Sequence, residues 1–277
     1  MVEGVHFLPD DPPDLVARKL LRVNLSDLAA KAAEPYGYLL TVAWSPAWGQ
    51  ARREAFARGL GEDQARFGLR LFGGDTVSTP GPMSASATLF GWVPAGRMIR
   101  RAGAKIGDLV LVSGTIGDGW LGLAAAGGRL DLPAGELSDT DLAWLAERYR
   151  LPSPRLGLRE ALRAHAHAGA DVSDGLLADA GHIAEASRVG VEIDLDRLPL
   201  SPPAARFRDR LAELASGGDD YEIVCTAAPD QAGPLIEAAR CAGVALTVCG
   251  RVTEGDGVSA TMGGRAVALE RLGWRHG

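Results

Sequence analysis

The segment Asp171-Val172-Ser173-Asp174-Gly175 constrains the fold more than any other part of this sequence. It follows an apolar stretch at residues 168–170 and precedes a predicted helix at about 175–187, so it reads as a strand-to-helix turn. Carboxylates at such a turn converge on one point, and these oxygen ligands suit a hard cation such as Mg²⁺. A simple helix N-cap is the alternative, and it is favoured for an isolated turn of this composition.

Similar acidic segments recur at residues 24–27 (NLSD), 73–76 (GGDT) and 216–220 (SGGDD). Asn, Ser and Asp are poor residues for a helix interior, so the first segment indicates a site on a predicted helix. In the second, two glycines allow the backbone to approach a ligand closely beside Asp75. Each segment alone is also compatible with a solvated face or a plain turn. Together, they predict a shared site for several Mg²⁺ ions.

Other site classes are excluded by the residues themselves. None of the three lysines is preceded by Gly and followed by Ser or Thr, which excludes a P-loop. H-E-x-x-H and G-x-S-x-G are absent. The three cysteines form no C-x-x-C, so we expect neither a disulfide framework nor a zinc site, and a reducing cytoplasm fits.

Charge and length limit the partners and the architecture. The net charge of −6 and the lack of runs of like charge argue against nucleic acid or a membrane surface as partner. We expect no signal peptide, because the first residues are not a basic stretch followed by an apolar one, and no membrane span, because no apolar run is long enough.

A chain of 277 residues is long enough to form two domains. The segment Pro94-Ala95-Gly96 predicts a boundary between residues 1–95 and 96–277.

Strands and helices alternate along the predicted chain. Strands are predicted at residues 2–8, 38–44, 69–72, 84–93, 109–113, 191–195, 223–226 and 245–249, and helices at 12–33, 52–67, 120–126, 139–150, 155–166, 175–187 and 231–242. A glycine-rich turn at residues 114–119 resembles a dinucleotide loop only loosely, since its glycine spacing is reversed. Such a turn can still hold phosphate on its backbone N–H groups.

Seven segments in order along the chain resemble the thiamine-monophosphate kinase family of the aminoimidazole ribonucleotide synthetase-like superfamily. They are VEGVHF (2–7), NLSDLAA (24–30), GGDT (73–76), RAGAKIGD (101–108), VSGTIGD (112–118), DVSDGLLAD (171–179) and SGGDDYE (216–222). The resemblance implies a two-domain α/β (α+β) fold with mixed sheets covered by helices. It also implies a homodimer that pairs the sheets of the two N-terminal domains.

The resemblance further implies an activity and roles for individual residues. The family transfers the γ-phosphoryl group of ATP to thiamine monophosphate, which gives thiamine diphosphate. By resemblance, Mg²⁺ is held by Asp27, Asp75, Asp171 and Asp174; ATP is contacted by Gly74, Asp75, Arg101 and Ser173; and thiamine phosphate lies along His6, Asp219 and Trp274. No general base is expected, because the acceptor phosphate is largely ionised at neutral pH.

Three departures from the family pattern leave alternatives open. Asp219 stands where the family usually has Glu, and Ile106 where it usually has Pro. A Gly-Asp-Asp motif and a Thr-Asp pair, which supply Mg²⁺ ligands in the family, precede its VEGVHF segment. We therefore expect the sequence either to continue upstream of Met1 or to lack part of the metal site. The alternatives are a non-catalytic protein that binds nucleotide or thiamine phosphate, and a related ATP-dependent synthetase with another acceptor.

Overall fold

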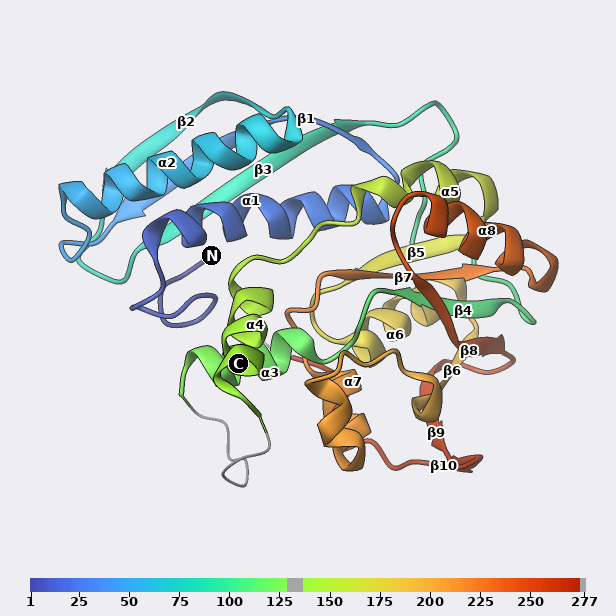
Figure 1. The fold of residues 1–277 in the computed structure, drawn as a ribbon. Coiled ribbons are helices and arrows are strands. Elements are labelled where there is room, and N and C mark those ends of the chain that lie inside the picture. Colours follow the sequence, from blue (N-terminus) through green and yellow to red (C-terminus); the bar gives the residue numbers. More distant parts are fainter. Residues whose placement is uncertain (129–136, 275–277) are drawn as a thin grey trace.

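The computed structural model describes residues 1–128 and 137–274, which form two sheets with helices packed on them (Figure 1). The smaller sheet has the strand order β2-β1-β3, with β1 at Glu34–Trp44, β2 at Arg70–Ser78 and β3 at Ser84–Trp92. β1 runs parallel to β2 and antiparallel to β3. The predicted α/β class with two sheets is thereby confirmed.

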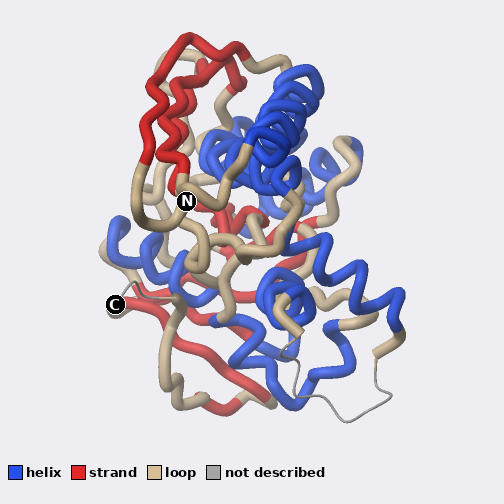
Figure 2. The backbone as a smooth tube through the Cα atoms, turned by 90° about the vertical axis from the view of Figure 1, so that its left-hand side faces the viewer, coloured by secondary structure: helices blue, strands red, loops and turns tan. Residues whose placement is uncertain are grey.

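One face of the small sheet is covered and the other is open. Helices α1 (Pro13–Ala30) and α2 (Gln50–Phe67) pack together on the covered face, and Figure 2 shows these two helices on one side of the strands. Tyr38, Val42 and Ala85 point into this core, which includes an aromatic group of Trp44, Trp48 and Phe56. Large apolar side chains stand exposed elsewhere on the same strands, among them Tyr36, Leu39, Leu71, Phe72, Val77, Phe90 and Trp92.

The larger sheet has the order β10-β9-β6-β8-β4-β7-β5. Its strands are β4 (Leu109–Ser113), β5 (Ala168–Val172), β6 (Gly190–Asp194), β7 (Glu222–Ala227), β8 (Leu246–Thr253), β9 (Gly257–Met262) and β10 (Arg265–Ala266). The helices of this half are α3 (Asp118–Ala126), α4 (Asp139–Arg150), η1 (Leu156–Leu158), α5 (Arg159–His165), α6 (Leu176–Ser187), η2 (Leu195–Arg197), η3 (Ala204–Arg210), α7 (Leu211–Ser216) and α8 (Pro229–Cys241). The neighbouring strands β4, β7 and β5 are buried along almost their whole length, and most of their residues are apolar or small.

Helix α1 links the two halves and thereby positions the site. Its first turns pack on the small sheet through Val16, Leu20 and Leu21. Its C-terminal end contacts β5 and β7, where Ala29 and Ala30 join a core under the larger sheet. A residue on the last turns of α1 therefore lies beside the ends of β5 and β7, although more than a hundred residues separate them in sequence.

Two predicted elements were wrong. The predicted strand at residues 2–8 is a set of turns, with isolated bridges of Val2 to Ser84 and of Glu3 to Phe7. The GGDT segment is not a turn after a short strand, because it lies inside β2. Phe72 has no partner on β1, because Tyr38 pairs with Leu71 and the next residue, Leu39, pairs with Gly73. The strand therefore has a bulge at Phe72 and continues through the two glycines. Strands β9 and β10 and helix α7 were not predicted.

Candidate functional site

A cavity of about 300 Å³ lies where the start of the chain, α1, the turn before α6 and the turn before β7 come together. Its lining includes His6, Asp219 and Trp274, which the resemblance implies for thiamine phosphate, together with Ser173 and Asp174 from the acidic turn. The remaining lining residues are Met1, Val5, Lys19, Val23, Trp120, Leu123, Ser216, Gly217, Gly218, Tyr221 and Arg271. Five predicted site residues from distant parts of the chain thus share one cavity.

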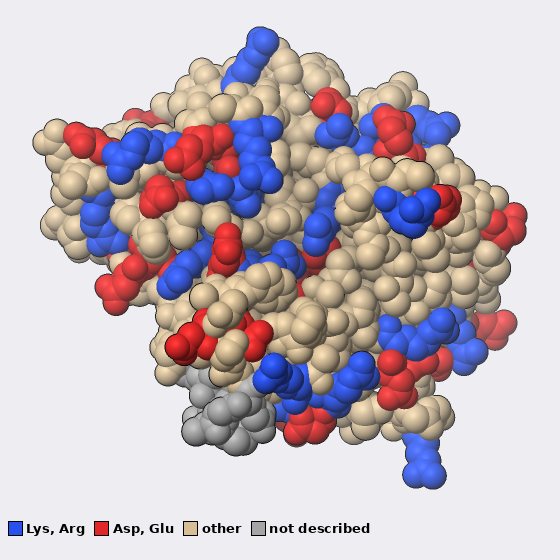
Figure 3. All heavy atoms as spheres, in the orientation of Figure 1, with Lys and Arg blue, Asp and Glu red and all other residues tan. Residues whose placement is uncertain are grey.

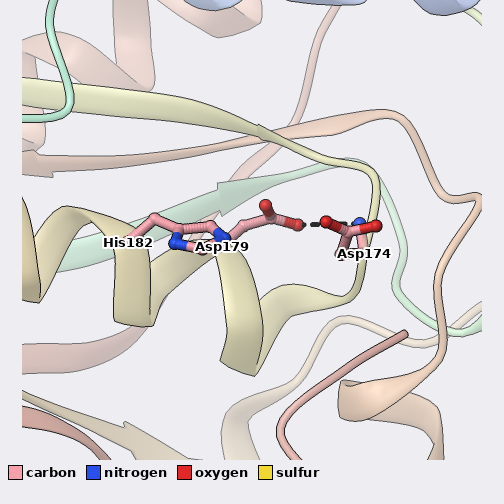
Figure 4. A group of neighbouring side chains, drawn as sticks. All are labelled: Asp174, Asp179 and His182. Atoms are coloured by element: carbon pink, nitrogen blue, oxygen red, sulfur yellow. Dashed lines mark hydrogen bonds between the residues drawn. The ribbon is translucent and has the colours of Figure 1, made fainter. Parts of the chain in front are cut away.

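The acidic turn is held by helix α6 and does not cap it. β5 ends at Val172 and α6 begins at Leu176, with Gly175 as an N-cap residue that makes no side-chain cap hydrogen bond. The Oδ2 atom of buried Asp179 instead accepts the backbone N–H groups of Ser173 at 3.0 Å and Asp174 at 3.1 Å (Figure 4). The N-cap alternative is therefore wrong, because neither side chain of the turn serves the helix.

Asp179 also belongs to a group that has the geometry to hold a cation. One carboxylate oxygen each from Asp174 and Asp179 and a ring nitrogen of His182 lie within 4.8 Å of one another (Figure 4). The pKa of Asp179 is raised to about 7, mainly by burial and also by the charges of Asp171 and Asp174, while the two N–H donors act in the opposite direction. The protein thus gathers negative charge around this turn.

The segment before β7 lies directly against the acidic turn. The backbone N–H of Asp219 donates to the carbonyl of Ser173 at 2.9 Å, and that of Tyr221 donates to the carbonyl of Val172 at 2.7 Å. Asp219 and Tyr221 both have positive φ, at 71° and 51°, a conformation that non-glycine residues adopt at some cost. Two of the predicted acidic segments are therefore joined by backbone hydrogen bonds.

The glycine-rich turn before α3 binds a carboxylate of the protein itself. The N–H groups of Gly117 and Gly119 donate to the two carboxylate oxygens of buried Asp220, at 2.7 and 2.8 Å. These two amides are satisfied internally, so the expectation that this turn holds phosphate on them was wrong. Their role is to fix Asp220 and, with it, the adjacent Asp219.

The carboxylates of Asp27 and Asp171 act on each other where α1 meets β5. Burial and, to a smaller extent, the charge of Asp27 together raise the pKa of Asp171 to about 7. Desolvation also raises the pKa of Asp27, even though this residue is exposed at the surface. The positive charges of Lys31 and Arg101 oppose this rise. Two carboxylates crowded in this way, with oxygen ligands only, fit a hard divalent cation.

Gly74 and Asp75 lie in β2 of the small sheet. Asp75 is exposed in the middle of β2, opposite Thr41, and its Oδ1 accepts the N–H of Thr76 at 2.8 Å. At Gly74, with φ at 155°, an added Cβ would overlap the carbonyl oxygen of Leu40 on β1. The close approach that this glycine permits is therefore to the neighbouring strand, whereas the sequence had suggested a ligand.

Lys19 was not singled out from the sequence, yet it lines the cavity. Its ammonium is 3.2 Å from Oδ1 of Asp219, 3.3 Å from the carbonyl of His6 and 3.4 Å from the centre of the Tyr149 ring. Burial lowers the pKa of Lys19, while Asp219 raises it. A sequence signal was available, because Lys19 falls among Val16, Ala17, Leu20 and Leu21 on the apolar face of α1.

Asp179 carried the same kind of signal, an acidic residue on an apolar stripe between Leu176 and Ile183. The face drawn in Figure 3 carries basic and acidic side chains side by side, in agreement with the mixed charge of the sequence. Within residues 1–128 and 137–274, no helix combines the length and the apolar character needed to cross a membrane.

Comparison with known proteins gives one consistent family. Residues 1–93 match the family model described as AIR synthase related protein, N-terminal domain, and residues 105–263 match AIR synthase related protein, C-terminal domain. Thiamine-monophosphate kinase of Caulobacter vibrioides is 57% identical over 284 residues, which cover 100% of this chain and 78% of that protein.

Solved structures give the same result. A thiamine-monophosphate kinase from Stenotrophomonas maltophilia K279a is 40% identical with a TM-score of 0.82, over 95% of this chain and 83% of that one. AaThiL complexed with AMPPCP and TMP is 30% identical with a TM-score of 0.85, over 100% of this chain and 84% of that one.

Proposed function

This chain belongs to the thiamine-monophosphate kinase family, and we propose that it transfers the γ-phosphoryl group of ATP to thiamine monophosphate, giving thiamine diphosphate and ADP. One observation carries the proposal beyond family membership: His6, Asp219 and Trp274 line the same cavity as Ser173 and Asp174. The relative AaThiL, whose solved structure is complexed with AMPPCP and TMP, supports the same pair of substrates, since AMPPCP is an ATP analogue.

The chemistry requires positioning rather than a general base. The acceptor is a phosphate oxygen whose second pKa is about 6, so it is already a nucleophile at neutral pH. The difficulty is to bring two anions together in line and to neutralise their charge. The chain's own contribution is therefore to orient the acceptor in the cavity, and to hold it beside the turn formed by Ser173 and Asp174. We propose direct in-line transfer, for which inversion at the transferred phosphorus would be the stereochemical mark.

Mg²⁺ is proposed as the metal, with Asp27, Asp171 and Asp174 as residues that would hold it and Asp75 as a fourth by resemblance. Support comes from the paired carboxylates of Asp27 and Asp171, whose oxygen donors suit this ion. When bound, Mg²⁺ would neutralise phosphate charge. Without a cation, the pKa values of both carboxyls are raised, so the protonated form is favoured. A bound cation would favour the ionised form of both, which supports a cation site at this pair.

ATP is proposed to contact Gly74, Asp75, Arg101 and Ser173. Arg101 is exposed, and its charge acts on Asp27 and Lys31, which supports a nucleotide near the C-terminal end of α1. A guanidinium there would bind phosphate oxygens with two parallel hydrogen bonds. Ser173 lines the cavity and directly follows β5, which carries Asp171, so in this proposal it can contact both substrates.

We also propose a homodimer and two domains, residues 1–95 and 96–277. Ring contacts join Tyr36 to Phe72 and Trp92, and Phe72 to Phe90, in an exposed apolar group on the small sheet. Exposed apolar surface of this kind supports an interface with a second copy. Light scattering measures the mass of the particle directly, and a monomer at micromolar concentration would contradict the proposed homodimer.

A cytoplasmic location is proposed from the cysteine usage.

Acceptor competition tests the function against its alternatives. The protein is mixed with ATP, Mg²⁺ and equal amounts of thiamine, thiamine monophosphate and aminoimidazole ribonucleotide precursors, and the products are separated by chromatography. We expect product from thiamine monophosphate alone. Binding of thiamine monophosphate without product would favour the non-catalytic binding protein, and product from another acceptor would favour the related synthetase.

A further inference from the structure

Lys19 connects three segments that line the cavity or support its wall. His6 precedes α1, Tyr149 lies on α4, and Asp219 lies between α7 and β7. The Lys19 ammonium contacts all three, through the His6 carbonyl, the Tyr149 ring and the Asp219 carboxylate. Its side chain is only 3% exposed, whereas that of Asp219 is 29% exposed. The lysine is thus enclosed, and its acidic partner keeps access to the cavity.

A buried ammonium loses its water and needs partners for its three donors. Lys19 has three partners for them: a carbonyl oxygen, a carboxylate oxygen and an aromatic face. Its charge therefore interacts with fixed groups in the wall of the cavity. A mobile surface lysine, in contrast, could move to contact a bound phosphate. Such a residue orients its neighbours, and two of the three neighbours here, His6 and Asp219, are residues that the family resemblance assigns to the substrate.

Asp219 needs this support because of its backbone. With φ at 71° it adopts a left-handed conformation that a non-glycine residue populates only when its surroundings impose it. On one side its N–H is held by the carbonyl of Ser173, and the next residue is held by the glycine-rich turn. Lys19 supplies the side-chain restraint, which directs the carboxylate.

We propose that Lys19 is a positioning residue that sets the affinity of the cavity for thiamine monophosphate, by fixing the Asp219 carboxylate and the His6 backbone. This rests on the proposed function. The oriented carboxylate of Asp219, which keeps access to the cavity, then faces the bound substrate. ATP is bound by other residues, so its affinity does not depend on Lys19.

Calorimetric binding tests this proposal without requiring turnover. Thiamine monophosphate and AMPPCP are each titrated into the wild-type protein, Lys19→Met and Lys105→Met. Lys105 is the matched control, because it is an exposed lysine whose ammonium approaches His167. We expect Lys19→Met to bind thiamine monophosphate at least about tenfold more weakly, as for the loss of a charged hydrogen bond. AMPPCP affinity should be unchanged in both variants, and Lys105→Met should match the wild type throughout.

A double-mutant cycle separates positioning from simple stabilisation. Asp219→Asn and the double variant Lys19→Met/Asp219→Asn should weaken thiamine monophosphate binding by about the same factor as Lys19→Met alone, because the residues act as one unit. A lower melting temperature of Lys19→Met with unchanged affinity for thiamine monophosphate would overturn the proposal. If Lys19→Met does not fold, Lys19→Gln replaces it and the same criterion applies.

The outcome for the wild type keeps the two proposals distinct. A wild-type protein that does not bind thiamine monophosphate contradicts the proposed function, and the role of Lys19 falls with it. A wild-type protein that binds thiamine monophosphate, with Lys19→Met binding equally well, contradicts only the role of Lys19.

Discussion

The backbone nitrogen of Asp174 lies 3.1 Å from Oδ2 of Asp179, and the same oxygen accepts the N–H of Ser173. A buried side chain on the first turn of α6 therefore reaches back to fix the turn that lines the cavity. Because this backbone is anchored from behind, the side chains of Ser173 and Asp174 remain available for ligands. This arrangement explains why an acidic residue occupies the apolar face of the helix.

Removing the Asp179 carboxylate should loosen that turn. In Asp179→Ala two N–H groups lose their acceptor, and we expect the free energy of unfolding to fall by roughly 1–3 kcal/mol. Asp179→Asn keeps a carbonyl oxygen that can accept both, so its loss should be smaller. Urea denaturation of the two variants measures the difference. Equal stability of Asp179→Ala and the wild type would contradict the anchoring role.

The raised pKa of Asp171 predicts how stability depends on pH. Its carboxyl has a pKa of about 7 in the folded protein against 3.8 in the reference state, so between these values the folded state holds a proton that the unfolded chain has lost. The free energy of unfolding should therefore fall as pH rises from about 4 to 7. Asp171→Asn should flatten this fall.

Mg²⁺ should change this dependence of the free energy of unfolding on pH. A cation that binds the ionised carboxylates favours the folded state at neutral pH, so stability curves measured with Mg²⁺ should fall less than curves measured with a chelator. Identical curves with and without Mg²⁺ would show that this cation does not bind the pair.

Gly74 and Gly73 offer a matched test of the β1–β2 contact. Both have strongly positive φ, but an added Cβ meets the Leu40 carbonyl only at Gly74 and finds open space at Gly73. Gly74→Ala should therefore destabilise the protein by about 1–3 kcal/mol more than Gly73→Ala, as overpacking does. Thermal unfolding provides the comparison, and equal melting temperatures would show that the strand pairing relaxes.

Asp174→Asn and Asp75→Asn test the predicted metal residues. Asp174 lines the cavity, and we expect its substitution to lower kcat by about 100-fold or more with an unchanged circular dichroism spectrum. Asp75→Asn is expected to have a similar effect by family resemblance, although Asp75 lies on exposed β2. Retained turnover in either variant would remove that residue from the metal site.

Much of the fold followed from local patterns. The bounds of β4 and α4 were predicted to the residue. The apolar run of β4 is a local signal, and in the structure α4 begins with a capping box between Ser138 and Asp141, which is also local. The GGDT strand was missed, because glycine is a turn residue in isolation and only the pairing with β1 keeps residues 73 and 74 extended. The last strands, β9 and β10, are short and have exposed positions, so they lack a clear apolar run.

Only part of the candidate site could be predicted from the sequence. Asp171 and Asp174 were singled out from the sequence because acidic turns are unusual, and their role as metal residues stays a prediction. Lys19 and Asp179 were missed, since their roles depend on contacts across the fold, with Asp219 and with backbone N–H groups. In both cases a charged residue on an apolar helix face was the available sign.

Transfer of labelled phosphate tests the central claim most directly. The protein is incubated with Mg²⁺, thiamine monophosphate and ATP labelled with ³²P at the γ-phosphate, and the products are separated. The account predicts that the label appears in thiamine diphosphate in a one-to-one ratio with ADP. Label that remains in ATP, or that appears only as inorganic phosphate, would contradict it.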